Sequence, residues 1–507
     1  MRQKGICHQI LQSLHPSALL CGLVLVGCAV GPNFNSPDAP EAEHYTSAEL
    51  SLEQAGASGE QKVVAGAEVP AEWWRLFGSE ALDGLIERGL ANSLTVAAAE
   101  ARLRAVQENL NSQVGAVLYP GVDATASTGR QKISGAAFGG TSSIFNLHNA
   151  SLSASYGLDL FGASRRYLEA LESAVDYEQY QLQAARLTLA VNMVTAVVKE
   201  ASLRGQIEAI KQIIADSEEQ LGMIEKQYAL GAVAQSAVLS QRSTLAQART
   251  ALPGVQKELQ QNRHLLNVLA GELPSETDIP EFTLDSLHLP QELPLSLPSE
   301  LVRQRPDIMA AEALLHQASA NIGVATANMY PRITLSGTYG SESRTTSGLF
   351  GAGSTVWSAG SGLVQPLFHA GELRAKKREA VATYEQAHAN YREVVLQSFR
   401  DVADTLLALE MDGRSVQLQR DAESAASDTR QLVQSQFQAG AASYLELLQA
   451  NQQWQQARIG RTQAEAARLA DSAALIYALG GGWWKQEAGE SETRIEDNND
   501  AVTENRP

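Results

Sequence analysis

The sequence predicts a mainly α-helical fold with a small β part, built from two copies of one pattern. Long stretches without proline keep apolar residues at spacings of three and four, which is typical of amphipathic helices. Shorter stretches alternate apolar and polar residues, which is typical of strands. Three landmarks, Tyr119, Gly231 and Gly271, recur 211, 209 and 209 residues later as Tyr330, Gly440 and Gly480. Nearly constant offsets of this kind indicate an internal duplication.

Composition excludes several classes of protein. Of 507 residues, 44% are hydrophobic and 19% charged, and the mean hydropathy is −0.17, so a polytopic helical membrane protein is not expected. The 39 Lys and Arg face 57 Asp and Glu, a net charge of −18 without a dense basic stripe, which argues against nucleic acid as a partner. Three cysteines are too few for a disulfide scaffold, and nine histidines are scattered without metal-ligand spacing. The sequence therefore predicts no enzyme and no cofactor other than a covalent lipid.

The N-terminus predicts export and lipid attachment. Residues 1–27 combine a short basic start with an apolar stretch too short to span a bilayer, as in a secretory signal peptide. The stretch ends in Leu25-Val26-Gly27-Cys28, which resembles a bacterial lipobox, so Cys28 is the expected lipidation site and mature N-terminus. The following residue, Ala29, is not Asp, which by the same resemblance favours the outer membrane. The alternative is a plain signal peptide followed by a chance cysteine.

The first copy of the pattern is expected over residues 79–271, after a polar, proline-flanked tether at residues 28–78. Its expected elements are a helix over 79–118, an alternating hairpin from Val122 to Leu160 around a loop at 134–143, and helices over 163–229 and 235–270. Pro253 is expected to kink or interrupt the last helix. The long helix carries a heptad seam with one polar gap at Ser217.

The second copy is expected over residues 298–484, after a proline-rich connector at 272–297. Its expected elements are a helix over 306–328, a strand beginning near Ile333, a loop over 341–354, a strand over 355–368, a long helix over 371–438 and a last helix ending at Leu479. Residues 485–507 are acidic and polar without periodic apolar residues, which predicts a disordered tail.

This set of elements predicts an oligomer. Four amphipathic strands in each chain cannot close around a lumen, because barrels begin at about eight strands. The long helices have a narrow apolar seam, which requires partners of equal length. A symmetric oligomer meets both requirements, with a β-barrel in a membrane continued by a barrel of helices.

Several short motifs carry a family resemblance over nearly the whole mature chain. They are Val30-Gly31-Pro32-Asn33-Phe34, Trp73-Trp74, Leu158-Asp159-Leu160-Phe161-Gly162, Leu297-Pro298-Ser299-Glu300-Leu301-Val302, Arg305-Pro306-Asp307-Ile308, and Gln365-Pro366-Leu367-Phe368 with Gly371. In this order they resemble the TolC-like outer-membrane efflux factors, in the lipoprotein (NodT/OprM-type) branch that serves resistance-nodulation-division pumps. The resemblance implies a homotrimer with a twelve-stranded outer-membrane β-barrel, a twelve-helix periplasmic tunnel and an equatorial girdle from tether and connector.

The resemblance also implies a function and partners. The chain is expected to be the passive exit duct of a tripartite efflux system, passing small molecules such as drugs, toxic organics or metal ions. Its expected partners are a periplasmic adaptor, an inner-membrane pump and outer-membrane lipid. The alternatives are a duct for type I-like protein secretion and a periplasmic coiled-coil lipoprotein without a pore, although a pore-free lipoprotein leaves the duplicated strands unexplained.

The helix breaks at Gly231 and Gly440 are the main candidate site. Structurally, each glycine fits a helix C-terminus in left-handed conformation, and a serine fits the cap of the returning helix. The resemblance adds that these turns form the periplasmic tip and dock the adaptor. The candidate docking residues are Leu230, Gly231, Ala232, Ser236, Val238, Gly440, Ala441, Ser443 and Leu445.

The residues before Gly440 are candidates for the periplasmic gate. They are Asp428, Leu432 and Gln434. Gln434 stands where the family pattern suggests an acid, which is a departure from that pattern. Asp428 also fits an ordinary solvated residue, and Leu432 fits core packing equally well. Arg305, Pro306 and Asp307 are assigned only the local role of starting a helix.

Overall fold

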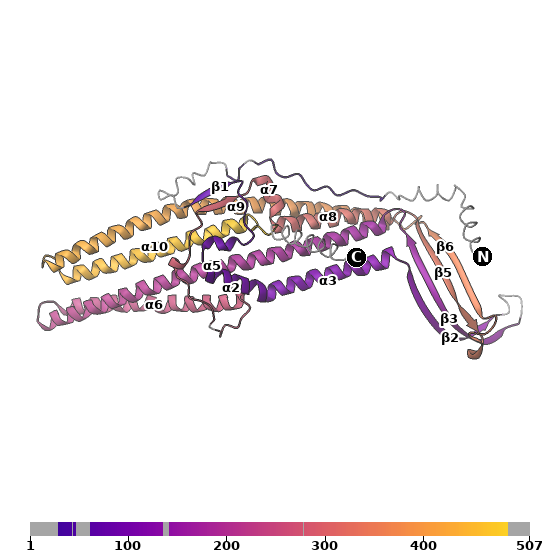
Figure 1. The fold of residues 1–507 in the computed structure, drawn as a ribbon, viewed down its shortest axis with the longest axis horizontal. Coiled ribbons are helices and arrows are strands. Elements are labelled where there is room, and N and C mark those ends of the chain that lie inside the picture. The colour runs from indigo at the N-terminus through magenta and orange to yellow at the C-terminus, as the bar shows by residue number, and fades with distance from the viewer. Residues whose placement is uncertain (1–28, 43, 47–60, 135–140, 277, 485–507) are drawn as a thin grey trace, which may run out of the picture. The chain divides into compact units, whose positions relative to one another are not determined.

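The computed structural model describes residues 29–42, 44–46, 61–134, 141–276 and 278–484 (Figure 1). The predicted signal peptide, Cys28 and the predicted tail at 485–507 lie outside these ranges. Two compact units are described separately below. Unit 1 comprises Met1–Pro37, Arg102–Glu178 and Ala311–Tyr391, and unit 2 comprises Asp38–Ala101, Gln179–Ala310 and Arg392–Pro507.

The same order of elements occurs twice, which confirms the predicted duplication. The first copy contains α2 (Glu80–Asn92), α3 (Leu94–Leu118), β2 (Gly121–Ile133), β3 (Ser143–Leu158), α5 (Ala163–Ala229) and α6 (Gln235–Leu269). The second contains α7 (Pro298–Gln304), α8 (Pro306–Ala327), β5 (Arg332–Ser343), β6 (Thr355–Val364), α9 (Glu372–Gln438) and α10 (Tyr444–Ala478). Both α5 and α9 have 67 residues, and both α6 and α10 have 35. At 1.5 Å per residue a 67-residue helix is about 100 Å long. In the described ranges, no helix has an apolar stretch long enough to cross a membrane.

Three predicted boundaries differ from the structure. The helix expected over 79–118 breaks at Ser93, which ends α2 in an extended conformation and whose hydroxyl lies 3.5 Å from the backbone nitrogen of Val96 at the start of α3. The predicted interruption at Pro253 is wrong, because α6 continues through this residue, which lies on an exposed face of the helix. The strand expected over 355–368 ends at Val364, shortly before Pro366, which has no N–H for a ladder.

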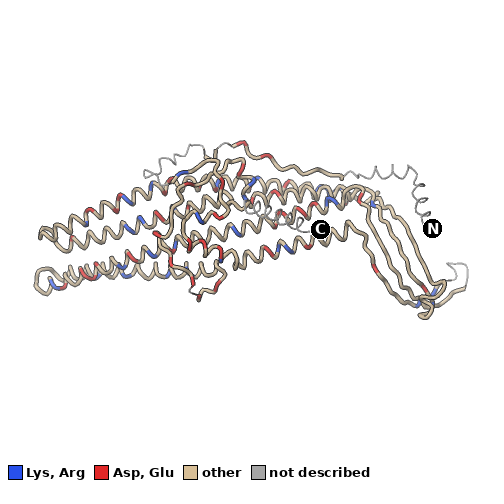
Figure 2. The backbone as a smooth tube through the Cα atoms, in the orientation of Figure 1, with Lys and Arg blue, Asp and Glu red and all other residues tan. Residues whose placement is uncertain are grey.

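In unit 1, four strands form one antiparallel sheet in the order β2-β3-β5-β6, visible side by side in Figure 1. The pairing of β2 with β3 is in continuous register from Gly121 opposite Ser155 to Ile133 opposite Ser143. β5 pairs with β3 on one side and with β6 on the other, also antiparallel and in continuous register. Charged residues are sparse along these strands compared with the helices (Figure 2).

Unit 2 contains a second, two-stranded sheet that the sequence did not predict. In it β1 (Lys62–Ala65) of the tether pairs in parallel with β4 (Glu292–Leu295) of the connector. A short 3-10 helix, η1 (Trp73–Phe77), follows β1, and η2 (Leu284–Ser286) precedes β4. Residues 61–78 of the tether and residues 278–297 of the connector therefore contain regular structure, although both lack hydrophobic periodicity.

The core of unit 2 lies where η1, α2 and α7 meet the long helices. Its largest fully buried side chains include Trp73, Phe77, Leu82, Leu85, Ile86, Met193, Leu266, Leu293 and Leu301. Fully burying each such side chain contributes about 1.5–3 kcal/mol. The tether and connector thus supply part of this core.

Candidate functional site

The unit 1 sheet has one apolar and one polar face. Leu152, Tyr339 and Trp357 are direct cross-strand partners, so their side chains share a face, and each is more than half exposed. On the opposite face, Ser153, Thr338 and Ser358 are partners in the adjacent row. The apolar face carries Val122, Ala124, Ala126, Leu152, Ala154, Tyr156, Leu158, Ile333, Leu335, Tyr339, Trp357, Ala359 and Leu363, and the other face carries mainly Ser, Thr and Gly.

Both edges of this sheet lack a partner among the described residues. β2 and β6 are the first and last strands of the four-stranded order. An edge strand presents a row of unpaired backbone N–H and C=O groups, which readily pair with another strand. The sheet can therefore be extended at both sides by further copies.

The first described residues, from Ala29 to Phe34, are held by contacts with other parts of unit 1. The backbone N–H of Val30 donates to the carbonyl oxygen of Phe161 at 3.1 Å. Arg166 is buried and donates to Asn33 at 2.6 Å, and Phe34 stacks on His316 with ring centroids 4.4 Å apart. A side chain at Gly31 would collide with the backbone of Gly323. The motif that begins at Val30 thus holds the N-terminal segment against α5 and α8.

The breaks at Gly231 and Gly440 have the same backbone geometry. Both glycines have positive φ, +74° and +72°. The N–H after each glycine donates 2.8 Å hydrogen bonds, from Ala232 to the carbonyl of Gln227 and from Ala441 to that of Gln436. Each glycine N–H closes the inner bond to Tyr228 or Phe437. This is the Schellman motif, which satisfies the last carbonyl groups of α5 and α9.

The returning helices begin differently in the two copies. Ser443 caps α10 in a capping box, accepting from the backbone N–H of Glu446 at 3.2 Å while the Glu446 carboxylate accepts from the Ser443 N–H at 2.6 Å. In the first copy Ala234 occupies the cap and makes no side-chain bond, so a capping role for Ser236 is wrong. Glu446 was missed in the sequence, although the spacing Ser-x-x-Glu is a known helix-start signal.

Most of the predicted docking residues are exposed at these turns. Leu230 is 84% exposed and Leu445 41%, and Gly231, Ala232, Gly440, Ala441 and Ser443 are also exposed. Val238 is different, because it is only 6% exposed and is buried within its own chain. We therefore remove Val238 from the docking set.

The predicted gate residues are exposed and lie on the last turns of α9. Leu432 is 59% exposed, and Asp428 and Gln434 are exposed as well. Within one chain, Leu432 is thus not a core residue. The exposed Leu432 side chain is therefore free to contact another copy of the chain.

A buried polar layer lies within the helices of unit 2. Ser217, the polar gap in the predicted seam, is fully buried, and its hydroxyl accepts from Gln452 of α10 at 2.7 Å. Gln241 of α6 donates to the carbonyl of Ser217 at 3.2 Å and to Gln220 at 2.9 Å. Ser217, at the gap in the apolar pattern, therefore links α5 to α6 and α10 by hydrogen bonds. Such bonds favour one register of these helices over others.

Known proteins resemble the chain over most of its length. The model of the family described as outer membrane efflux protein matches residues 85–272 and 297–481. The pyoverdine export outer membrane protein OpmQ of Pseudomonas aeruginosa is 32% identical over 425 residues, covering 82% of this chain and 89% of that protein. The probable efflux pump outer membrane protein TtgC of Pseudomonas putida is 31% identical over 485 residues, covering 93% and 96%.

A solved structure agrees with these sequence matches. The outer-membrane channel OprN superimposes with a TM-score of 0.80 and 26% identity, covering 90% of this chain and all of that one. The predicted TolC-like fold and the predicted role as an outer-membrane efflux channel with periplasmic helices, and not as an enzyme, are confirmed. The protein is thus a component of an efflux system. The chain belongs to the outer membrane efflux protein family.

Proposed function

We propose that three copies of this chain form the exit duct of a tripartite efflux system that carries small molecules. In this proposal a periplasmic adaptor and an inner-membrane pump of the resistance-nodulation-division type deliver the cargo, and the duct is passive. Support comes from relatives named for pyoverdine export and for efflux pumps, all of which concern small molecules or ions. The proposed repeat boundaries remain 79–271 and 298–484, close to the two family matches.

The two-faced, open-edged sheet is the observation that carries this proposal. Apolar side chains such as Leu152, Tyr339 and Trp357 suit contact with lipid, and the Ser, Thr and Gly face suits a watery lumen. Four strands are too few to close a barrel, whereas three chains supply twelve and pair each β2 with a neighbouring β6. Closure removes every unpaired edge, which the interior of a bilayer requires.

Lipid on Cys28 is the second part of the proposal. Ala29 lies against Gly162, at the turn between β3 and α5, because a side chain at Gly162 would meet Ala29 at 2.7 Å. Ala29 directly follows Cys28 in the sequence, so a lipid on Cys28 would be attached one residue before this contact with Gly162. Metabolic palmitate labelling should be lost in Cys28→Ala, and label retained on another residue would contradict the assignment.

The hairpin turns are the third part. We assign adaptor docking to the turns at Gly231 and Gly440, and gating to Asp428, Leu432 and Gln434. Exposed, small residues at the turns suit close approach by another helix, as at Ala232 and Ala441. Leu432 of three chains would form an apolar constriction if the α9 ends converge on one axis.

Two measurements test the duct. Native mass measurement of the detergent-solubilised protein should give a trimer, and single-channel recording in planar bilayers should show conducting pores. Trp357→Asp places a charge on the lipid-facing side and should reduce insertion, whereas the matched change Ser358→Asp on the lumen face should leave insertion intact. A stable folded monomer, or equal effects of both changes, would contradict the arrangement.

A further inference from the structure

The apolar face of the unit 1 sheet carries two basic residues near one end. β2 follows α3 and β5 follows α8, while β3 leads into α5 and β6 into α9. The end of the sheet far from the helices is therefore the end at Ile133 and Ser343. By strand register, Arg130 and Lys132 of β2 lie near this far end and on the same face as Leu152. Within the four described strands, no other Lys, Arg, Asp or Glu lies on that face.

Both basic residues are available to an anion from outside the chain. The acidic residues of these strands, Asp123 and Glu342, have the register of the Ser, Thr and Gly face. Arg130 and Lys132 are exposed, and neither forms an ion pair with a residue in the part of the chain that the structure describes. The apolar face of the strands thus has charge of one sign, and that charge is unneutralised.

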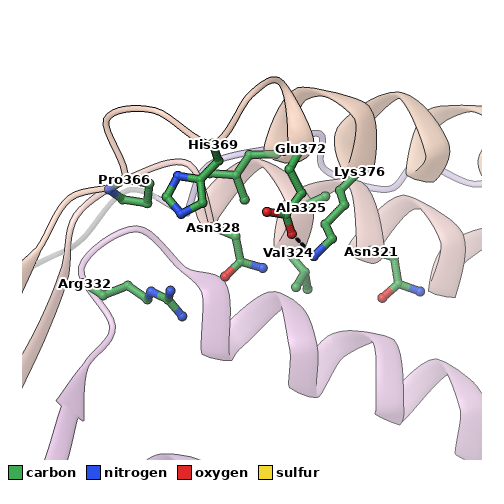
Figure 3. A pocket seen from close by; sticks show the side chains of 10 residues that line it. Asn321, Val324, Ala325, Asn328, Arg332, Pro366, His369, Glu372 and Lys376 are labelled. Atoms are coloured by element: carbon green, nitrogen blue, oxygen red, sulfur yellow. Dashed lines mark hydrogen bonds and ion pairs between the residues drawn. The ribbon is translucent and has the colours of Figure 1, made fainter.

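The basic residues at the helical end of the sheet are arranged differently (Figure 3). Arg332, at the start of β5, has the register of the Ser, Thr and Gly face and extends toward Asn328 of α8. Lys376 of α9 lines the same cavity, where it pairs with Glu372 at 2.7 Å. These groups belong to the polar side of the sheet and to an internal ion pair, unlike Arg130.

The position of Arg130 along the strands fits a membrane surface. On the apolar face, β3 carries only Ala, Leu and Tyr from Leu158 to Ala150, a span of eight residues, or about 27 Å at 3.4 Å per residue. A strand tilt of about 40° reduces this to a height of roughly 20 Å, close to the apolar band of outer-membrane barrels. Arg130 lies opposite Asn146, beyond that band. Charges on the lipid side are costly at the midplane and tolerated at the interface.

The apolar face is hollowed next to these basic residues. A second hollow of about 380 Å³, bordered by Trp357, shares Leu152 and Tyr339 with a larger one of about 520 Å³. The two hollows adjoin and form one apolar groove, because alanines between the large side chains leave space. The apolar lining of the larger hollow is Ala124, Ala126, Ala150, Leu152, Tyr339 and Phe350.

The loop between β5 and β6 is fixed at this groove. Ser341 lies on the apolar face by register and donates to the Ser354 hydroxyl at 2.6 Å, and Ser354 donates to the carbonyl of Gly351 at 2.7 Å. The Ser341 hydroxyl also contacts the carbonyl of Leu349. Phe350, between these anchored residues, lines the groove and is 82% exposed. A large apolar side chain held in this way marks a binding surface.

We propose that the groove and the basic residues beyond it bind lipid A, the phosphorylated and acylated glucosamine lipid of lipopolysaccharide. The proposal rests on the proposed placement of the sheet in the outer membrane. Because the helices are periplasmic, the far end of the sheet then lies in the outer leaflet, which consists of this lipid. Acyl chains lie in the groove, and Arg130 and Lys132 bind a phosphate.

The spacing along β2 favours a lipid that carries a sugar. Ala126 of the groove and Arg130 are four residues apart, about 14 Å at 3.4 Å per residue. A sugar ring between the acyl chains and the phosphate spans part of this distance. Thr128 and His148, whose side chains are joined by a hydrogen bond of 2.8 Å, lie between the two on the same face and can bind sugar hydroxyls.

Native mass spectrometry tests the basic residues. Delipidated protein in detergent is titrated with bisphosphorylated lipid A, comparing wild type with the double variant Arg130→Gln/Lys132→Gln. The control is Arg374→Gln/Lys377→Gln, which removes the same two charges from exposed positions of α9. Lipid A binding should weaken about tenfold in the strand variant and stay unchanged in the control. Equal weakening in both variants would show a response to net charge alone and overturn the site.

Three further probes identify the ligand. Lipid A without its phosphates should bind the wild type and the Arg130→Gln/Lys132→Gln variant equally. Neither dioleoyl phosphatidylglycerol nor inorganic phosphate, at the concentration of lipid A, should displace it from the wild type. Displacement by phosphatidylglycerol would assign the groove to a glycerophospholipid, and displacement by inorganic phosphate would assign it to a free anion. Either result overturns the lipid A assignment.

The apolar groove has its own test. Ala126→Phe fills the groove and should weaken lipid A binding, whereas Ala359→Phe, on the same face but outside both linings, should not. Phe350→Ser removes an apolar wall without altering a strand and should also weaken binding. If Phe350→Ser leaves binding unchanged, or if the two alanine variants bind equally, the acyl assignment is wrong.

Conductance in planar bilayers keeps this inference separate from the duct. The Arg130→Gln/Lys132→Gln variant should conduct as the wild type does, because its changes lie on the lipid side of the sheet. A wild type without conductance would refute the duct. A conducting wild type whose lipid A binding does not depend on Arg130 and Lys132 would refute this inference alone.

Discussion

Arg305 donates a hydrogen bond of 3.0 Å to the carbonyl oxygen of Ala478, so a buried side chain at the start of α8 holds the C-terminal end of α10. The same guanidinium donates to Asp307 at 2.7 Å and to Asp401 of α9 at 3.3 Å. Burial by itself lowers the pKa of Arg305, but the hydrogen bonds and charges of Asp307 and Asp401 outweigh it and raise that pKa. The residue therefore joins α8, α9 and α10 in unit 2.

Removing this arginine should destabilise the fold strongly. Arg305→Met removes the ion partner of Asp307, leaves Asp401 paired with Arg400 alone, and removes a donor from the carbonyl oxygen of Ala478. Because both carboxylates are partly exposed, the expected cost is about 1–3 kcal/mol. Thermal unfolding followed by far-UV circular dichroism measures the effect. Arg303→Met, two residues earlier and exposed, is the control and should change the melting temperature little. If the two variants had the same melting temperature, the structural role assigned to Arg305 would be wrong.

The carboxyl groups of Asp412 and Asp471 should make stability depend on pH. Burial, followed by a hydrogen bond to Asp471 and its charge, raises the pKa of Asp412 from 3.8 to about 7, while Arg468 acts in the opposite direction. An acid with a higher pKa in the folded protein binds its proton more tightly when folded. The contribution of Asp412 to stability is therefore fully present below about pH 4 and is lost as pH rises from about 4 to 7.

The size of this effect is bounded by solvent exposure. A shift of this extent corresponds to about 4 kcal/mol if fully realised, and partial exposure of the pair reduces it to a fraction of that value. The wild-type protein should melt at a lower temperature at pH 8 than at pH 5.5, and this difference should be smaller in Asp412→Asn. Asp404→Asn, on an exposed face of α9, is the control. An undiminished pH difference in Asp412→Asn would contradict the assignment.

Two glycines with positive φ at the ends of different helices, Gly231 after α5 and Gly480 after α10, should differ in their tolerance of alanine. Gly231→Ala meets no atom within 4 Å, so its cost is that of a positive φ, about 1–2 kcal/mol. Gly480 has φ +94°, and a side chain there would also lie 2.7 Å from the carbonyl oxygen of Gln304. Overpacking should add about 1–3 kcal/mol. Melting temperatures of the two variants compare the costs directly, and a larger loss in Gly231→Ala would be the contrary result.

The docking turns can be tested by photo-crosslinking. A photoreactive amino acid at Ala232 or Ala441 should capture a periplasmic adaptor in cells during export, because both residues are exposed next to the helix breaks. A probe at Thr141, in the loop between β2 and β3, serves as the control and should not capture it. If the adaptor were captured from Thr141 and from neither Ala232 nor Ala441, the proposed orientation would be wrong.

The gate proposal predicts a change in conductance. Leu432→Ser and Asp428→Asn should raise single-channel conductance in planar bilayers, because they remove an apolar constriction and a carboxylate from the ends of α9. Leu418→Ser is the control, since Leu418 is 68% exposed but lies in α9 well before the last turns that carry Asp428 and Leu432. Equal conductance of all three variants and wild type would place the constriction elsewhere.

The limits of prediction follow from the kind of information each feature needs. The turns at Gly231 and Gly440 could be found in the sequence, because glycine and a break in periodicity are local signals, and both glycines have positive φ. The burial of Val238 could not be found in this way, since its neighbours on the other helices decide it. The cavity lined by Arg332, Glu372 and Lys376 was missed for the same reason, because these residues come from two elements, β5 and α9, that only the fold brings together.

Local sequence patterns were enough to predict the duplication, the long helices, the two-faced strands and the helix breaks. These depend on periodicity, proline and glycine, whose effects act within a few residues. Three other features became visible only in the fold: Lys62 of β1 lies opposite Glu292 of β4, Arg305 donates to the carbonyl of Ala478, and Ser217 is fully buried. Each of these depends on contacts between residues far apart in the chain, whose partners no local pattern specifies, because hydrogen bonding and burial depend on which elements pack together.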